Sequence, residues 1–350
     1  MSDSGTLSAL IGEAKFKLRW FDLGRRLQPV SRTAAEAFEA GQAPWPYPYL
    51  RQAWVALLLW PEEGGEPVVW FLRLPLDEQG KLQLQARDAF LRLLTQKLQQ
   101  NGKAPSESAA QQLHGALEQS GLLFTPAPER QASFHARAAL LLKRPASSHY
   151  AATLSYFHEP QSSRWDQLAI QGIADLAARW DGEQKVILQA IPSLAPPVFI
   201  SLCQCLENEA VDHQLADGII RRAQIELHGE SPDLAIIAAA VRGISHSPAR
   251  GMRLEFLTQV LNASAGANGE ILAAIGSRCA YDLEHEALAR AWLGALAQHQ
   301  NQSTFNLLMS DLMFLPQVRS SLLNALRDPA RPEALARAFG EFLHGPKPTH

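Results

Sequence analysis

The first 125 residues combine strand-like and helical patterns of apolar positions. Between residues 15 and 30, apolar and polar residues alternate from Phe16 to Trp20, and further apolar residues follow around the turn Asp22-Leu23-Gly24, which predicts a β-hairpin. Two further apolar runs, over residues 54–60 and 68–74, are separated by a polar loop that contains two glycines. We expect these runs to form a second hairpin.

Helical patterns accompany both hairpins. Ser31 is a suitable N-cap for a short helix that ends at Gly41. Residues 87–100 carry apolar side chains on one helical face, and residues 106–119 predict another helix. The order β-β-α-β-β-α-α predicts an α+β domain with a small antiparallel sheet over residues 1–125.

After residue 125 the strand patterns nearly disappear. We interpret residues 126–147 as a linker with a first helix, because the alanines of 132–142 favour a helix over a strand. From 148 to 344, apolar helical segments alternate with short breakers of proline, glycine or asparagine. Residues 345–350 are expected to form a disordered tail.

The expected helix starts fall into two interleaved series. They lie near residues 148, 181, 212, 248, 282 and 315, and near 164, 196, 231, 267, 301 and 332. Each series advances by roughly 31 to 36 residues, a spacing typical of stacked helical repeats. Residues 233–241 are apolar almost all round, as an inner helix should be. We therefore predict an all-α, HEAT-like helical repeat array, an α-solenoid, with an irregular helical bundle as the alternative.

Composition and charge narrow the class of protein. Of the 350 residues, 47% are hydrophobic and 19% charged, which is typical of a globular protein. A net charge of -3 provides no general attraction to nucleic acid or to an anionic membrane. The first residues lack a basic start followed by an apolar run, and the longest apolar run, 53–60, is too short to cross a bilayer. We expect a cytoplasmic protein without a membrane partner.

No metal or cofactor motif emerges from the sequence. The three cysteines are Cys203, Cys205 and Cys279. So few indicate a reducing compartment, and Cys203 and Cys205 point to nearly opposite sides of a predicted helix, which favours buried apolar thiols over a metal clip. His285-Glu286 begins an H-E-x-x-H pattern, but Ala289 occupies the position of the second histidine. Glycine-rich nucleotide-binding motifs are missing from the sequence as well.

The most distinctive stretch is a loop of alternating prolines and aromatic residues. Trp45, Tyr47 and Tyr49 are each separated by a single proline. A stiff, amphipathic loop of this kind suits partner recognition, since buried aromatic anchors dominate interface energetics. The alternative is that these aromatic side chains fill the core of a small domain.

Two polar segments accompany this loop. Arg25 and Arg26 follow Asp22 in the first predicted turn, and Asp77 and Glu78 lie in a later one. If the two hairpin ends meet, these residues can form an ion-pair network. The adjacent acids also permit a catalytic carboxylate pair, although carboxylates in turns are more often simply solvated.

Three blocks of the chain resemble one known family. They are Phe21-Asp22-Leu23-Gly24-Arg25-Arg26, Tyr47-Pro48-Tyr49-Leu50-Arg51-Gln52-Ala53-Trp54 and Leu74-Pro75-Leu76-Asp77-Glu78-Gln79-Gly80. Together they resemble an uncharacterised bacterial family catalogued as domain of unknown function 3549, over nearly the whole chain. The resemblance implies a bacterial cytoplasmic protein, and it transfers no activity or catalytic residue.

The leading functional hypothesis is a non-enzymatic adaptor or scaffold for a protein partner. The residues expected to bind that partner are Trp45, Tyr47, Tyr49, Asp22, Arg25, Arg26, Asp77 and Glu78. One alternative is an enzyme with its site in the N-terminal domain or at the domain junction. Another is a helical repeat protein that binds nucleic acid, which the acidic net charge disfavours.

Overall fold

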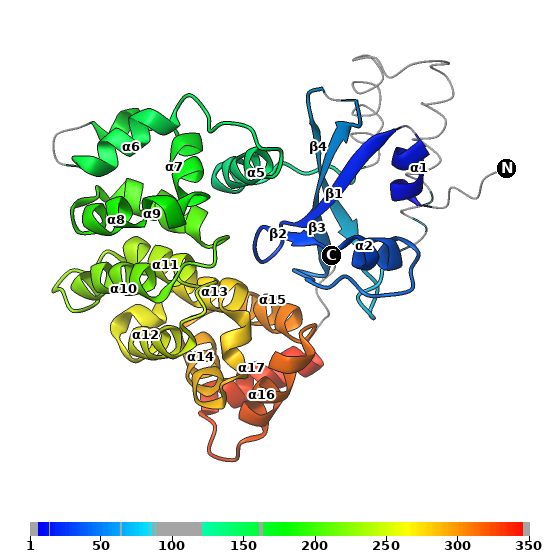
Figure 1. The fold of residues 1–350 in the computed structure, drawn as a ribbon. Coiled ribbons are helices and arrows are strands. Elements are labelled where there is room, and N and C mark those ends of the chain that lie inside the picture. The colour runs from blue at the N-terminus through cyan, green and yellow to red at the C-terminus, as the bar shows by residue number, and fades with distance from the viewer. Residues whose placement is uncertain are drawn as a thin grey trace. The chain divides into compact units, whose positions relative to one another are not determined.

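The computed structural model describes residues 6–345, apart from 14, 64, 84, 86–87, 89–120 and 161–163. The chain forms two compact units, Met1–Ala127 and Pro128–His350 (Figure 1). The helices expected over 87–100 and 106–119, and the tail expected after residue 345, lie outside the described residues. That the two units fold independently stays a prediction.

The first unit contains a four-stranded antiparallel sheet with the strand order β2-β1-β3-β4. The strands are β1 (Phe16–Asp22), β2 (Gln28–Val30), β3 (Gln52–Pro61) and β4 (Val68–Pro75). Both predicted hairpins and the small antiparallel sheet are confirmed. The central strand β3 is buried from Val55 to Leu59, which explains why its sequence reads as one continuous apolar run.

One face of this sheet packs against two short helices, α1 (Leu7–Glu13) and α2 (Arg32–Glu39). The hydroxyl of Ser31 accepts the backbone N–H of Ala34 at 3.2 Å, so the predicted cap of α2 is confirmed. The buried carboxylate of Glu39 accepts the backbone N–H of Leu7 at 2.9 Å and thereby holds the start of α1 against the end of α2.

The second unit is largely helical. Its described helices are α5 (Pro128–Leu141), α6 (Tyr150–His158), α7 (Ile170–Ala177), α8 (Trp180–Ala190), α9 (Pro196–Leu206), α10 (His213–Leu227), α11 (Leu234–Gly243), α12 (Arg250–Asn262), α13 (Gly269–Arg278), α14 (Glu286–His299), α15 (Gln302–Leu312), α16 (Pro316–Arg327) and α17 (Glu333–His344). The expected starts lie within a few residues of the observed ones. The largest difference is at α7, where a 3-10 turn over Trp165–Gln167 precedes the helix.

The helices of this unit contact one another in two rows (Figure 1). Each odd-numbered helix from α5 to α17 packs against the next odd-numbered helix, and each even-numbered helix from α6 to α16 packs against the next even-numbered one. The rows meet where consecutive helices contact each other, as α10 contacts α11. As predicted for 233–241, α11 is an inner helix: it is buried from Ile236 to Val241 and packs between α9 and α13.

The three cysteines lie in this core as free thiols. Burial raises the pKa of the Cys205 thiol to about 12 and the pKa of Cys203 well above its ordinary value. Both therefore stay protonated at neutral pH and fill space as small apolar groups. In the part of the chain that the structure describes, no helix is both long and apolar enough to cross a membrane.

Candidate functional site

The predicted recognition loop is anchored in the core of the first unit by Trp45. Its side chain is only 2% exposed, and its ring lies 4.9 Å from that of Phe38, centroid to centroid. Its indole N–H donates to Asp22 Oδ1 over 3.2 Å, and its backbone N–H donates to the carbonyl of Gly80 over 2.8 Å. Trp45 therefore takes the core-packing alternative, because a large aromatic ring beside an apolar sheet face gains more from burial than from facing water.

The two tyrosines of this loop are half-buried. Tyr47 packs against the same core, whereas the Tyr49 ring lies 6.4 Å from that of Trp54. The guanidinium of Arg25 lies over the Tyr49 ring at 5.4 Å, and its Nε–H donates to the carbonyl of Pro48 at 3.2 Å. Since Arg25 is itself buried, it holds the loop from within.

The expected ion-pair network between the two turns does not form. Asp77 uses its carboxylate within its own turn, where Oδ1 accepts the backbone N–H groups of Gln79 at 2.8 Å and Lys81 at 2.9 Å. Among these four described residues, no ion pair joins Asp77 or Glu78 to Arg25 or Arg26. These hydrogen bonds are typical of an aspartate that stabilises its own turn.

Glu78 is exposed and Arg26 is half-buried. The eight predicted residues thus fall into three groups: Asp22, Arg25 and Trp45 are buried, Arg26, Tyr47 and Tyr49 are half-buried, and Asp77 and Glu78 lie in a separate turn. Whether any of them contacts a partner stays a prediction.

A buried glutamate in the second unit gathers three arginines, a cluster that sequence reasoning missed. Glu207, at the C-terminal end of α9, pairs with Arg130 of α5, Arg242 of α11 and Arg278 of α13. The distance is 3.3 Å to the Nη1 of Arg242 and 3.0 Å to the Nε of Arg278. We call Glu207 and these three arginines the Glu207 cluster.

Electrostatics keep this carboxylate ionised. Burial by itself raises the pKa of Glu207, but the nearby charges of Arg278, Arg130 and Arg242 outweigh it and hold the pKa below the ordinary value. Next to the cluster, buried Glu209 pairs with Arg137 of α5. These ion pairs join four helices of the odd-numbered row.

The sequence did carry a signal for the Glu207 cluster. Glu207, Arg242 and Arg278 recur near the C-terminal ends of α9, α11 and α13, about one helix pair apart. Charged side chains that recur at the repeat spacing are expected to meet when neighbouring helices align.

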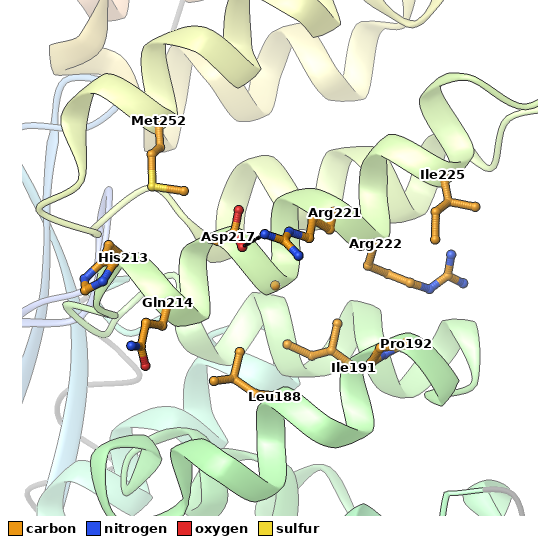
Figure 2. A pocket seen from close by; sticks show the side chains of 11 residues that line it. Leu188, Ile191, Pro192, His213, Gln214, Asp217, Arg221, Arg222, Ile225 and Met252 are labelled. Carbon is orange, nitrogen blue, oxygen red and sulfur yellow. Dashed lines mark ion pairs between the residues drawn. The ribbon is translucent and has the colours of Figure 1, made fainter.

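A groove of about 490 Å³ lies on the even-numbered row, over α10 (Figure 2). Residues of α10 form its middle, Leu188, Ile191 and Pro192 border it on one side, and Met252 of α12 borders it on the other. Arg221 pairs with Asp217 across one helical turn at 2.8 Å. The groove thus combines an aliphatic border with exposed charges, the surface chemistry of many protein-binding sites.

The described residues contain no group of three or more His, Cys, Asp or Glu side chains arranged to hold a metal ion. The features that this part of the chain does offer are the Glu207 cluster, which ties helices together, and the groove over α10.

The fold defines a class of protein with two units. The first is an antiparallel sheet packed against helices, and the second is a helical unit in which each helix packs mainly on its near neighbours. The chain belongs to the family described as Protein of unknown function (DUF3549), whose model matches residues 3–343. This membership confirms the resemblance carried by the three sequence blocks. Comparison with curated proteins and with solved structures found no match.

Proposed function

We propose that this protein is a non-enzymatic scaffold in which α5–α17 form a HEAT-like α-solenoid that binds a protein partner. The observation that carries the proposal is the packing of helices in two rows, each helix against the helix two places along the chain. Stacked repeats pack in this way because one helix pair has too little apolar surface to be stable alone. Such arrays present long, continuous surfaces, which suit the binding of other proteins.

The spacing of the helices supports the same proposal. Starts within one row, such as those of α9, α11 and α13, recur after about 35 residues, which is close to the period of known helix-pair repeats. The Glu207 cluster adds support because its members occupy comparable ends of these helices. A closed bundle has no reason to repeat the same helix end at regular intervals.

Small-angle X-ray scattering of residues 128–350 tests the solenoid. A compact chain of this length has a radius of gyration of about 17 Å. We expect a clearly larger value and an asymmetric distance distribution, because stacked helix pairs extend along one axis. A value at the compact limit, with a symmetric distribution, contradicts the solenoid.

Affinity purification of the tagged full-length chain from its native cells tests the binding role. We expect a stoichiometric protein partner that remains bound as the salt concentration rises from low to moderate. Nucleic acid that dissociates over the same range would instead support the nucleic-acid alternative, since phosphate contacts weaken steeply with salt. Recovery of the chain alone under gentle cross-linking contradicts the scaffold.

A further inference from the structure

The groove over α10 follows one face of that helix. Asp217, Arg221 and Ile225 are spaced four residues apart, and His213 precedes them by the same interval. These positions lie along one stripe of an α-helix. At 1.5 Å per residue the stripe is about 18 Å long, which corresponds to five or six residues of an extended peptide.

Aliphatic groups border the groove along this length. Ile191 is buried, Leu188 and Met252 are partly exposed, and Ile225 is 65% exposed at the C-terminal end of the stripe. The Cβ that Gly218 lacks would lie 2.9 Å from the Leu188 side chain, so this glycine lets α8 and α10 approach closely beneath the groove. An aliphatic side chain placed here removes apolar surface from water on both partners.

The two arginines of the groove differ in how firmly they are held. Arg222 is mostly buried, pairs with Glu226 at 2.7 Å and lies over the ring of Phe199 at 5.9 Å. The Arg221 side chain is 75% exposed, whereas its partner Asp217 is half-buried. Because an exposed ion pair contributes little stability, Arg221 can exchange Asp217 for another carboxylate at small cost.

We propose that this groove binds a segment of another protein that presents an aliphatic side chain beside a carboxylate. The aliphatic side chain packs against Ile225 at the C-terminal end of the stripe, and the carboxylate pairs with Arg221 one helical turn away. Arg222 is already held by Glu226, whereas Arg221 is the more exposed member of its pair with Asp217, so the groove offers a partner's carboxylate an accessible cation. This inference rests on the scaffold function proposed above and specifies the partner's chemistry.

A peptide selection tests the groove with a defined probe. Phage-displayed random 12-residue peptides are selected against the full-length chain, and the best binder is measured by fluorescence anisotropy. We expect selected peptides to combine an aliphatic residue with Asp or Glu. Arg221→Glu and Ile225→Ser should each weaken binding at least tenfold, and replacing the peptide's acid by lysine should restore binding to Arg221→Glu.

Two matched variants control for general effects of charge and of exposed apolar surface. Arg290 forms an exposed pair with Asp328 at 3.3 Å on α14, and Leu343 of α17 is 58% exposed. Arg290→Glu and Leu343→Ser should bind the peptide within twofold of the parent, and all four variants should melt like the parent.

Three outcomes overturn the proposal. The first is a selection that yields no binder. The second is a binder that Arg221→Glu and Ile225→Ser bind as tightly as the parent does. The third is a self-association of the chain that Arg221→Glu abolishes, which would assign the groove to a second copy. Purification from native cells separates this failure from that of the scaffold. If the double variant Arg221→Glu/Ile225→Ser retains the cellular partner, the proposed role of the groove is wrong and the proposed scaffold function is unaffected. If the parent chain has no partner, the scaffold function itself is contradicted.

Discussion

Trp45 illustrates how one residue type supports two opposite roles. A tryptophan between prolines suits a docking loop, but the ring here packs between Trp20 and Phe38, with centroids 6.3 and 4.9 Å away. Its indole N–H also donates to Oδ1 of the buried carboxylate of Asp22. Packing of Trp45 therefore accounts for the conformation of the loop, in which the two tyrosines are half-buried and Pro44 and Pro46 are exposed.

We therefore predict that Trp45→Ala lowers the free energy of unfolding by about 3 to 5 kcal/mol, the usual cost of removing a buried large aromatic side chain. Tyr47→Ala, at a half-buried position, should cost clearly less. Urea denaturation followed by tryptophan fluorescence and circular dichroism measures both. A Trp45→Ala protein that is as stable as the parent would contradict the packing role and favour a role of Trp45 in partner binding.

Glu207 is the residue on which the odd-numbered row depends most. Glu207→Gln leaves three nearly buried guanidinium groups without their shared counter-charge. We predict a loss of about 3 to 5 kcal/mol at neutral pH, because the remaining buried charges are no longer compensated. As a control, Glu284→Gln should cost less than about 1 kcal/mol, since Glu284 is partly exposed and lies 3.9 Å from Arg250.

The effect of Glu207→Gln also depends on pH in a defined direction. The pKa of Glu207 is lower in the folded protein than its ordinary value of 4.5, so the ionised carboxylate stabilises the fold above pH 4.5. That contribution is lost as the pH falls through the lowered, folded-state pKa. The stability difference between parent and Glu207→Gln should therefore be constant near neutrality and narrow in acid below pH 4.5. A difference that grows in acid would mean that Glu207 is not an ionised partner of the arginines.

At the scale of helices and strands, the close approach of α6 and α7 depends on Gly172. A Cβ at this position would clash with the Thr153 hydroxyl and would lie 2.7 Å from the carbonyl oxygen of His149. Gly294, in the interior of α14, has no other group within 4 Å of the position where its Cβ would be. The two glycines therefore differ in whether tertiary packing tolerates a methyl group.

We predict opposite effects for the same substitution at these two glycines. Gly172→Ala should destabilise the protein by about 1 to 3 kcal/mol through overpacking. Gly294→Ala should stabilise it by about 0.4 to 1 kcal/mol by restricting the unfolded chain. Thermal melts of the two single variants distinguish the effects, and a Gly172→Ala variant that melts at or above the parent's temperature would contradict the close approach of α6 and α7.

The elements themselves were largely predictable from local sequence. Period-two apolar positions located β1, and a continuous apolar run located the buried strand β3. Breakers located most helix starts, because proline, glycine and capping residues act over only a few positions. The start of α7 was misplaced because Leu168 and Ala169 are extended and no side chain caps the helix, a choice that the local sequence does not signal.

The candidate site was much less predictable, since its members are distant in the chain. Arg130 and Arg278 lie 77 and 71 residues from Glu207, and their pairing depends on how whole helices align. The groove over α10 likewise needs α8 and α12 beside it. In the first unit, an ion-pair network was possible if the two polar turns met, but the Asp77 carboxylate instead accepts backbone N–H groups of its own turn. Side-chain pairing across elements follows from tertiary packing, which spacing alone does not determine.

At the scale of the whole molecule, the second unit has a continuous apolar core of its own, which runs from Ala132 in α5 to Ala338 in α17. We predict that residues 128–350, expressed alone, fold into a helical protein with a cooperative thermal transition, because this core needs no residue of the first unit. Circular dichroism and calorimetry provide the measurement. An aggregated fragment without a transition would show that the two units share a core.

The two helix rows have a consequence for how the second unit responds to mechanical load. Each helix packs mainly on neighbours close to it in the chain. In the proposed solenoid, tension along the rows would therefore act on a series of similar interfaces. The ion pairs of the Glu207 cluster bridge α5, α9, α11 and α13 and stiffen that part of the series. In the proposed solenoid, bending should therefore concentrate between α13 and α17, and the curvature of this end would adjust to a partner while the other end keeps its shape.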